Sequence, residues 1–338
     1  MTIRDVAEYC GVSVSTVSRV LNDRPDVSSD VRARVLKAIK ELHYVPNTSA
    51  RSLVSTSSAN IGVIVRGGGN PFYIPIVQAL EQEINTAGYS MSIRFIPSGA
   101  DEVSIGARLV RSKRLAGLIF MGGRFDYEED IAAALEVPFL CCTFTNSFGY
   151  MPDGICSSVS IDDRTEAYNA VSYLIKKGHR KIAILLNSRD DCSISQLRFM
   201  GYCDALKDAG LEINEDLICE MGGYDMGAAY SSMNRLLDDP AEFTAVFVIA
   251  DTLAIAAMKA VHEHGMQIPE DISVISIDGL DMSRYTLPTL TTLTQPVETL
   301  GHEAARTLIY VIECSAPHRQ ITLKAQLREG GTVAKPKK

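Results

Sequence analysis

The sequence of 338 residues lacks any apolar run long enough to cross a membrane, which would take about 20 residues. It also lacks the apolar stretch of a secretory signal, because its first ten residues, MTIRDVAEYC, already contain Asp5 and Glu8. We therefore expect the protein to stay in the cytoplasm. A two-lobed binding protein for transport, which would carry such a signal, is not expected.

The cysteines and histidines lack the spacing of a metal site. The eight cysteines include no C-x-x-C pair, and the six histidines are scattered along the chain. Some cysteines lie in apolar surroundings, as Cys141 and Cys142 do in LCCTF, which is typical of small buried residues in a reducing compartment. No Ser/His/Asp or paired-carboxylate constellation stands out either. The sequence predicts no metal, no cofactor, no catalytic residue and no enzyme.

Charge is unevenly distributed along a chain of otherwise ordinary globular composition. Hydrophobic residues make up 46% and charged residues 22%, and the length suggests about two domains. Residues 1–56 hold eight Lys and Arg against six Asp and Glu, whereas the rest holds 25 against 35. A weakly basic head on an acidic body favours a nucleic-acid-binding module joined to a domain that does not touch phosphate.

The head has the pattern of a helix-turn-helix. Thr2 can cap a first helix, Gly11 can supply the positive φ of a tight turn, and Ser13 can cap a second helix over 14–22. The small side chain of Ala7 lets these two helices cross closely, and a third helix follows Ser28. The alternative is a small helical bundle that serves as a cap or an interaction module.

Longer motifs connect the chain to a family. TIRDVAEYCGVSVSTVSRVLN and VSSDVRARVLKAIKELHYVPNTSARSL closely resemble the DNA-binding head of the LacI/GalR family of bacterial transcription regulators. The resemblance continues through GHRKIAIL, RFMGYCDAL, IPEDISVISID and PTLTTLTQP and covers essentially the whole chain. It implies a dimeric or tetrameric repressor whose affinity for operator DNA is controlled by a small, sugar-like effector. Some relatives are corepressor-dependent, so a ligand or a phosphoprotein partner that strengthens DNA binding stays open as the alternative.

The second helix is the expected reader of DNA. Arg19 can make a bidentate contact with guanine, Val14 offers an apolar surface to a thymine methyl, and Ser15 a short hydroxyl. The alternative for Arg19 is a solvated helix charge. The resemblance implies further DNA contacts, mostly to phosphate, at Ser13, Thr16, Ser18, Asn22 and Tyr44.

Residues 47–57 are expected to form a hinge helix and linker. The resemblance implies that the hinge folds only when two copies meet over the minor groove, where Leu53 wedges between base pairs. Ala50 lies one turn earlier on the same face, and Asn47 can cap the helix. The alternative is a flexible Ser-rich linker, since LVSTSSAN follows directly.

The remainder alternates apolar strands with amphipathic helices, which predicts parallel sheets covered on both faces. We expect strands at 61–65, 90–96, 115–121, 137–142, 181–186, 244–249 and 272–277. The predicted fold class is α/β, with a helix-turn-helix domain at 1–46 and a two-lobed body of the type I periplasmic-binding-protein kind at 58–338. Lobe 1 is expected over about 58–160 and 291–322, and lobe 2 over about 161–290 and 323–338. The chain should cross between them near 160–163, 286–292 and 320–325.

Ligands of open α/β sheets bind beyond the carboxyl ends of the strands, here in a cleft between the lobes. Phe72, Tyr73, Arg198 and Asp251 follow such strands and match effector positions of the family. Aromatic rings suit a sugar or base, and Arg and Asp suit hydroxyls or carboxylates. Further contacts are expected from Asn146, Tyr224 and Gln295.

Three positions in this cleft are open to two interpretations. Asp278 matches a recurrent acid of the family but could simply cap a loop, and Arg198 could instead be an ion-pair partner between the lobes. Arg66 and the three glycines after it depart from the family pattern and would favour an anionic sugar. The alternative for Arg66 is a flexible loop with the side chain in solvent.

Overall fold

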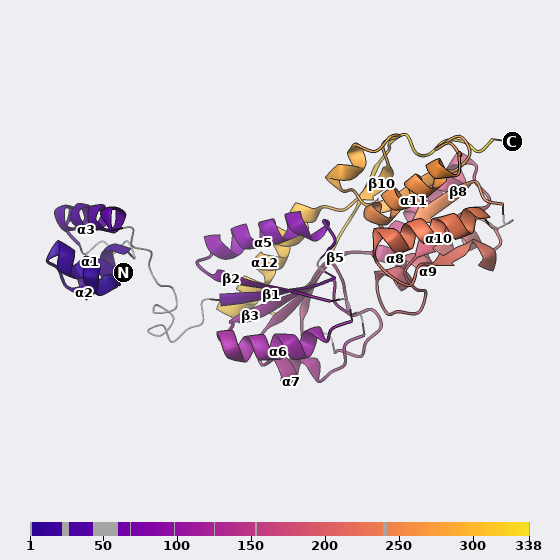
Figure 1. The fold of residues 1–338 in the computed structure, drawn as a ribbon. Coiled ribbons are helices and arrows are strands. Elements are labelled where there is room, and N and C mark those ends of the chain that lie inside the picture. The colour runs from indigo at the N-terminus through magenta and orange to yellow at the C-terminus, as the bar shows by residue number, and fades with distance from the viewer. Residues whose placement is uncertain are drawn as a thin grey trace. The chain divides into compact units, whose positions relative to one another are not determined.

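The computed structural model divides the chain into two units, Met1–Ser58 and Ala59–Lys338. It describes residues 2–21, 27–42, 60–67, 69–97, 99–124, 126–152, 154–238 and 242–337. Figure 1 shows that the first unit is helical and that the second combines helices with sheets. The predicted hinge at residues 47–57 lies outside the described residues.

The first unit contains the predicted helix-turn-helix. Its helices are α1 (Ile3–Cys10), α2 (Val14–Leu21) and α3 (Ser29–Glu41). Thr2 caps α1 reciprocally with Asp5: its hydroxyl accepts the N–H of Asp5 at 3.4 Å, and its own N–H donates to the Asp5 carboxylate at 2.7 Å. Gly11 ends the helix at φ 62°, a left-handed conformation that glycine adopts without steric cost.

A small apolar core joins the three helices. It is built from residues on one face of each helix, namely Val6, Ala7, Cys10, Val17, Val20, Val35 and Ala38. Ala7 and Val17 belong to the two helices on either side of the turn, so the small alanine permits their close approach, as the sequence predicted. The face of α2 opposite to Val17 and Val20 is therefore left for other contacts.

The second unit consists of two lobes, each with a six-stranded sheet, which confirms the predicted α/β class. Sheet A has the order β11-β5-β4-β3-β1-β2. Its strands are β1 (Asn60–Arg66), β2 (Ser90–Ile96), β3 (Gly117–Met121), β4 (Phe139–Cys142), β5 (Ser157–Ile161) and β11 (Gln320–Leu323). All of its strand pairs are parallel. Helices α5 (Tyr73–Thr86) and α12 (Val297–Cys314) pack together, as do α6 (Glu102–Lys113) and α7 (Ile131–Leu135), and the two pairs cover opposite faces of sheet A (Figure 1). These elements form lobe 1.

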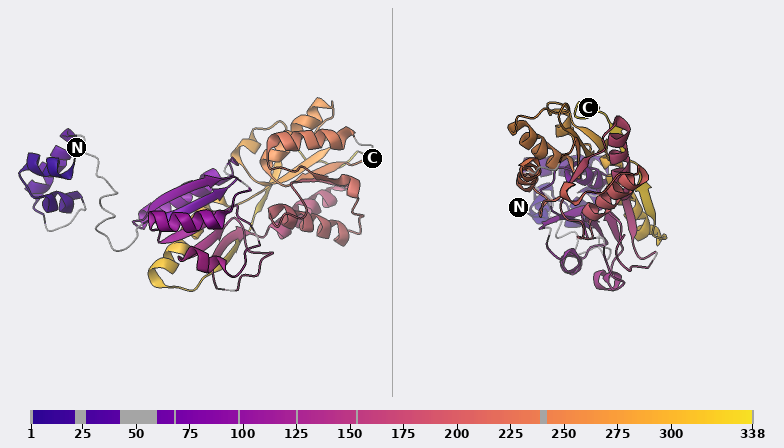
Figure 2. Two further views of the ribbon diagram at one scale, coloured as in Figure 1. Left: turned by 60° about the horizontal axis from the view of Figure 1, so that its bottom comes forward. Right: turned by 90° about the vertical axis from the view of Figure 1, so that its right-hand side faces the viewer.

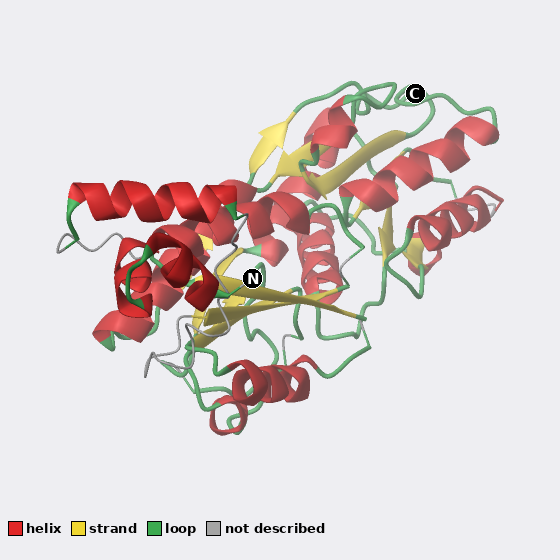
Figure 3. Cartoon of the chain, turned by 60° about the vertical axis from the view of Figure 1, so that its left-hand side comes forward, coloured by secondary structure: helices red, strands yellow, loops and turns green. Residues whose placement is uncertain are grey.

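Lobe 2 repeats this plan around sheet B, which has the order β12-β10-β9-β8-β6-β7. Its strands are β6 (Ile182–Leu186), β7 (Ile218–Glu220), β8 (Ala245–Val248), β9 (Ser273–Asp278), β10 (Thr291–Thr294) and β12 (Gln326–Arg328). Its helices are α8 (Asp163–Lys177), α9 (Ile194–Asp208), η1 (Glu215–Leu217), α10 (Met226–Asp238), α11 (Asp251–Glu263) and η2 (Asp281–Arg284). Only β12 pairs antiparallel among the described strands of this sheet. Figure 3 shows helices on the outside of both sheets.

The chain passes three times between the lobes. The first passage separates β5 from α8, and the third lies between β11 and β12, both where they were expected. The second was expected near 286–292 but follows β10, because Thr291–Thr294 pairs with β9 and with β12 in sheet B. Residues 291–294 therefore belong to lobe 2, and only α12 and β11 return to lobe 1. Figure 2 shows the gold helix α12 against the purple strands of lobe 1.

The central strands of both sheets are buried, as continuous apolar strands predict, whereas the edge strands β2, β11 and β12 are largely exposed or half-buried. Strands β3, β4, β6 and β8 are buried along their whole length, and their side chains form the centres of the lobe cores. Strand β5 was not predicted, because its sequence SSVSI is mostly polar. Its buried serines find partners near β11: Ser157 lies 3.0 Å from His318 Nδ1, and Ser158 donates to Gln320. Within the described residues, no helix has the length and apolarity that crossing a membrane requires.

Candidate functional site

The exposed face of α2 carries the described residues that were predicted to contact DNA. Ser13, Val14, Ser15 and Arg19 are exposed, whereas Thr16 and Ser18 are half-buried. Ser13 accepts the N–H of Thr16 at 3.2 Å, and its hydroxyl lies 2.7 Å from that of Ser15 and 2.8 Å from that of Thr16. The start of α2 thus presents clustered hydroxyls beside the apolar side chain of Val14, which is 40% exposed. Five further predicted contacts lie outside the described residues, namely Asn22, Tyr44, Asn47, Ala50 and Leu53.

In the second unit, the two lobes contact each other beyond the carboxyl ends of their strands. Leu280 of lobe 2 packs into the apolar cluster of lobe 1 that includes Phe72. Ile194 and Leu197, at the start of α9 in lobe 2, pack against a second cluster of lobe 1 that includes Tyr127. Most of the predicted effector residues lie at or near these contacts.

Phe72 and Tyr73 reach this interface from the start of α5. The side chain of Asn70 accepts the N–H of Phe72 at 3.0 Å and so fixes the turn that carries both rings. The rings lie edge to face with centroids 5.6 Å apart. Burial raises the pKa of Tyr73, and Asp278 of lobe 2 raises it further, so the phenol faces across the interface. Its hydroxyl lies against Gly122, which has a φ of 64° and leaves no room there for a Cβ.

Arg198 is buried inside lobe 2. It is 2% exposed, and its guanidinium lies 2.7 Å from Asp163 and 3.8 Å from Asp278. It also donates to the backbone carbonyl of Ile249. Burial alone would lower the pKa of Arg198, but the two carboxylates raise it, so the guanidinium stays charged. All of these partners belong to lobe 2, so the structure does not place Arg198 in an ion pair between the lobes.

Asp278, the last residue of β9, is the most unusual group at the interface. Its φ of 139° is strained for a residue other than glycine, and the side chain is 4% exposed. Gln295 holds it through two bonds of 3.0 Å, from the side-chain amide to Oδ1 and from the backbone N–H to the Asp278 carbonyl. The other oxygen, Oδ2, is buried without a hydrogen-bond partner among the described residues. Burial raises the pKa of Asp278 to about 8 against the opposing effect of Arg198.

Asp251, by contrast, has both carboxylate oxygens occupied. Oδ1 accepts the hydroxyls of Ser276 and Thr292, and Oδ2 accepts the N–H of Leu280 at 2.8 Å. These bonds tie the start of α11 to β9, β10 and the loop that carries Leu280. The geometry indicates that Asp251 positions this loop.

The remaining two predicted effector residues are Asn146, which is hydrogen-bonded to the backbone of the protein, and Tyr224, which is partly exposed. Asn146 forms two bonds with the backbone of Tyr127, accepting its N–H at 2.6 Å and donating to its carbonyl at 3.0 Å. Tyr224 is 43% exposed, but burial of its hydroxyl raises its pKa, and Asp191 adds to this shift. Arg198 acts on it in the opposite direction, which places this phenol near the buried arginine.

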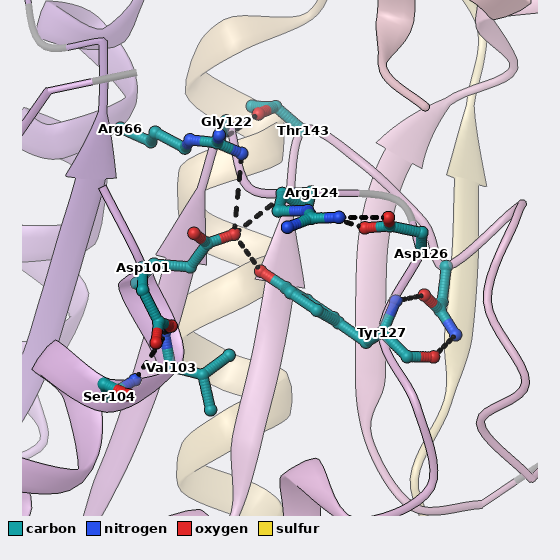
Figure 4. A network of polar contacts seen from close by, with 11 residues as sticks. Arg66, Asp101, Val103, Ser104, Gly122, Arg124, Asp126, Tyr127 and Thr143 are labelled. Atoms are coloured by element: carbon teal, nitrogen blue, oxygen red, sulfur yellow. Dashed lines mark hydrogen bonds and ion pairs between the residues drawn. The ribbon is translucent and has the colours of Figure 1, made fainter. Parts of the chain in front are cut away.

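A second polar group lies in lobe 1, where the loops after β1, β2 and β3 converge (Figure 4). Its centre is Glu102, which is 1% exposed. Glu102 Oε1 accepts the hydroxyl of Tyr127 and the N–H of Arg124, both at 2.8 Å, and lies 3.7 Å from the guanidinium of Arg66. Arg66 is therefore paired with a buried carboxylate, with 19% of its side chain exposed, and is not a loop residue in solvent. The same pairing removes the positive charge on which the expectation of an anionic ligand depended.

Outside this interface, a groove of about 360 Å³ lies between α8 and the strands β10 and β12. Its walls include Tyr173, Lys176, Leu293 and Leu327. None of the predicted effector residues lines it.

The sequence reasoning missed Asp163 and Glu102 and left Asp278 undecided. Asp163 follows β5 in the acidic pair Asp162–Asp163, which reads as an ordinary helix start, since Asp162 accepts the N–H of Thr165. Glu102 follows Asp101, the N-cap of α6, and reads in the same way. The signal that could have identified Asp163 and Glu102 is their position, because both acids begin a helix directly after a strand or after the loop that follows one.

Comparisons with known proteins agree with this arrangement. Residues 2–47 match the model described as "Bacterial regulatory proteins, lacI family", and residues 171–333 match that of a "Periplasmic binding protein-like domain". The HTH-type transcriptional regulator MalR of Clostridium butyricum is 36% identical over 333 residues, which cover 97% of this chain and 98% of that protein.

Solved structures resemble the whole chain as well. The Lac repressor dimer bound to operator and the anti-inducer ONPF has a TM-score of 0.82 at 26% identity and covers 99% of both chains. The complex of the transcriptional regulator CelR with cellobiose has a TM-score of 0.73 at 26% identity, over 98% of this chain and 99% of that one. The likeness thus includes the head and both lobes together.

Proposed function

The chain belongs to the LacI family of bacterial regulatory proteins and is a DNA-binding transcriptional regulator, not an enzyme; on this premise we propose that a neutral sugar bound between its lobes controls its affinity for operator DNA. The buried, unpartnered Oδ2 of Asp278 is the observation that carries the proposal. A buried polar oxygen without a hydrogen-bond partner costs free energy, about 1–3 kcal/mol for a neutral group and more for a charged one. A sugar hydroxyl, which both donates and accepts, supplies the missing partner in either protonation state of the carboxyl.

The surroundings of Asp278 favour a neutral ligand. Arg198 is already paired with Asp163, and Arg66 is already paired with Glu102. Each of these two arginines therefore has a carboxylate beside it that offsets its positive charge. The aromatic pair Phe72 and Tyr73 supplies the apolar faces on which sugar rings stack. The names of two similar proteins point to the same chemistry, since a ribose operon repressor of Haemophilus influenzae, 30% identical over 92% of this chain, and the CelR–cellobiose complex both name a sugar.

The residues divide into two roles under this proposal. Asp278, Phe72, Tyr73 and Tyr224 contact the sugar. Arg198, Asp251, Asn146 and Gln295 have their polar groups engaged with the protein and hold those contacts in place. Two lobes that close on a ligand change their mutual arrangement, and this change is what a ligand can transmit to the DNA heads.

The DNA-binding mode follows from the head. One α2 helix covers only one half-site, so we propose a homodimer, or a dimer of dimers, on a roughly palindromic operator in the bacterial cytoplasm. Val14, Ser15 and Arg19 face the bases in this proposal, and Ser13, Thr16 and Ser18 the phosphates. The hinge contacts of Asn47, Ala50 and Leu53 stay predictions.

Fluorescence anisotropy with a labelled operator tests the function. Adding ribose or cellobiose, the sugars that similar proteins name, to the full chain should change operator affinity in one direction, and that direction distinguishes induction from corepression. A 100-fold change corresponds to about 2.7 kcal/mol, within the usual range of coupling between two sites. Asp278→Asn should abolish the response and leave sugar-free operator binding near normal. An unchanged response in this variant would contradict the assignment of Asp278.

A further inference from the structure

The carboxylate of Glu102 is held at the point in lobe 1 where a ligand of an open α/β sheet binds. Strands β1 and β3 are neighbours in sheet A, yet β2 lies between them in sequence, so the crossovers diverge at this pair. Arg66 ends β1, Arg124 follows β3, and Glu102 begins the helix after β2. Figure 4 shows Arg66, Arg124 and Tyr127 converging on one carboxylate oxygen.

The two oxygens of the Glu102 carboxylate differ in their hydrogen-bond partners. Oε1 has the Tyr127 hydroxyl and the Arg124 N–H at 2.8 Å. Oε2 is buried and has no hydrogen-bond partner among the described residues. Removing a carboxylate from water is costly, and the attraction of a nearby cation repays this cost only if the remaining acceptor sites are also satisfied. A buried oxygen left open is thus a position that a ligand donor can fill.

This group borders the same interface as Asp278. Tyr127 belongs to the cluster against which Ile194 and Leu197 of α9 pack, and Leu197 precedes Arg198 directly. The start of α9 therefore packs against the cluster that includes Tyr127 and also carries the arginine beside Asp278. The Glu102 group thus borders, from lobe 1, the interface that Asp278 borders from lobe 2.

We propose that Glu102 and Arg66 form a lobe 1 subsite that selects a neutral sugar over its phosphorylated form. The inference rests on the proposed function, since it concerns the same ligand. Glu102 Oε2 accepts one sugar hydroxyl, and the Arg66 guanidinium donates to the oxygen of a neighbouring hydroxyl. Of the three groups around Oε1, Arg66 makes the longest contact, an ion pair of 3.7 Å, whereas Arg124 and Tyr127 donate hydrogen bonds of 2.8 Å.

Charge makes this subsite selective. Ionised carboxylates only accept hydrogen bonds, and a guanidinium only donates them, so the pair fits hydroxyl groups, which do both. A phosphate at the same place would meet the Glu102 carboxylate in a site that excludes water, where like charges repel strongly. Discrimination by such a repulsive element is a common source of specificity.

The matched ligands for the test are cellobiose, which the similar CelR complex contains, and cellobiose 6′-phosphate, titrated by calorimetry into the full chain and its variants. The wild type should prefer cellobiose. Glu102→Gln keeps the shape but removes the charge, so cellobiose affinity should fall about 10-fold or more while affinity for the phosphorylated sugar rises. Arg66→Gln should shift the preference further toward cellobiose, because it removes the cation and leaves the carboxylate.

Glu166→Gln is the control, because Glu166 is also a buried carboxylate but has both oxygens occupied, by the N–H of Ala325 and the side chain of Asn169. It should leave the ratio of the two affinities unchanged. Equal effects of Glu102→Gln on both sugars, or a changed melting temperature with an unchanged ratio, would overturn the inference and leave the proposed function intact. A wild type that bound neither sugar would overturn both. If Glu102→Gln did not fold, the shift expected for Arg66→Gln decides, and its absence would overturn the inference.

Discussion

Arg198 is bound to Asp163 and only approaches Asp278: its guanidinium lies 2.7 Å from the first carboxylate and 3.8 Å from the second. Asp163 is the first residue of α8, directly after the chain enters lobe 2. The arginine therefore connects α9 to the start of lobe 2, and its positive charge also acts on Asp278 at the interface. A scaffold role and an influence on the ligand site coexist in one side chain.

Replacing this arginine should therefore lower the free energy of unfolding of lobe 2. Arg198→Ala leaves Asp163 buried without its cation, which costs about 3–5 kcal/mol in comparable buried pairs. Urea unfolding of the full chain, followed by circular dichroism, measures the loss. Arg189→Ala is a control in the same lobe, because Arg189 is more exposed and pairs with Glu215 and Glu220 near the surface. It should cost about 1 kcal/mol or less. A stable Arg198→Ala protein that had lost only sugar binding would contradict this role.

Asp278 should make stability depend on pH in an unusual direction. Its pKa in the folded protein, about 8, lies above the value of 3.8 for an unperturbed aspartate. The folded protein therefore binds this proton more tightly than the unfolded chain does. The stabilising effect is complete below about pH 4 and is lost as the pH rises through about 8.

Asp278→Asn removes this dependence. Relative to the variant, the wild type should lose about 1.4 kcal/mol of unfolding free energy per pH unit between about pH 5 and 7. Denaturation at several pH values measures both proteins, and titrations shared by the two cancel in the difference. A constant difference across this range would show that Asp278 titrates normally.

Gly122 should be needed for the position of Tyr73. Gly122→Ala places a Cβ against the Tyr73 hydroxyl and forces a residue with a side chain into φ 64°, which costs about 1–2 kcal/mol. Gly154→Ala is the matched control, since Gly154 has a φ of 86° but open space around its Cβ. Both variants should lose stability in thermal denaturation through backbone strain, and Gly122→Ala should lose more because its Cβ also meets Tyr73. Only Gly122→Ala should also weaken sugar binding, and equal sugar affinities in the two variants would argue against a sugar contact by Tyr73.

Arg19 should read one base pair. Arg19→Ala is expected to cost about 1–3 kcal/mol of operator affinity and to relax the preference at a single position of each half-site. Binding to a set of operators with single substitutions measures this pattern. A uniform loss across all of them, with a shallower dependence on salt, would make Arg19 a phosphate contact.

The sequence was sufficient for the elements whose pattern is local. The apolar strands were found to within one or two residues, as at β1 and β6, because runs buried on both faces are apolar throughout. The turn at Gly11 was found because a left-handed helix end favours glycine. Strand β5 escaped because its serines are satisfied by residues about 160 positions away.

The candidate site shows the same limit. Position after a strand was the reason for predicting Phe72, Tyr73 and Arg198 as site residues, but it did not show which polar atoms are already engaged. Asp251 and Asp278 both follow or end strands of sheet B, yet only Asp278 has an open oxygen. That difference depends on Thr292 and Leu280, whose approach to Asp251 is set by the fold and leaves no pattern in the sequence.

The order of strands along the chain also governs when the body can assemble during synthesis. Sheet A is complete only with β11 and sheet B only with β12, and both strands fall within residues 320–328. A ribosome must therefore translate nearly the whole message before either lobe has all of its strands. A premature stop shortly before residue 320 would leave β5 and β10 without their outer partner strands, so a single late truncation damages the two lobes together.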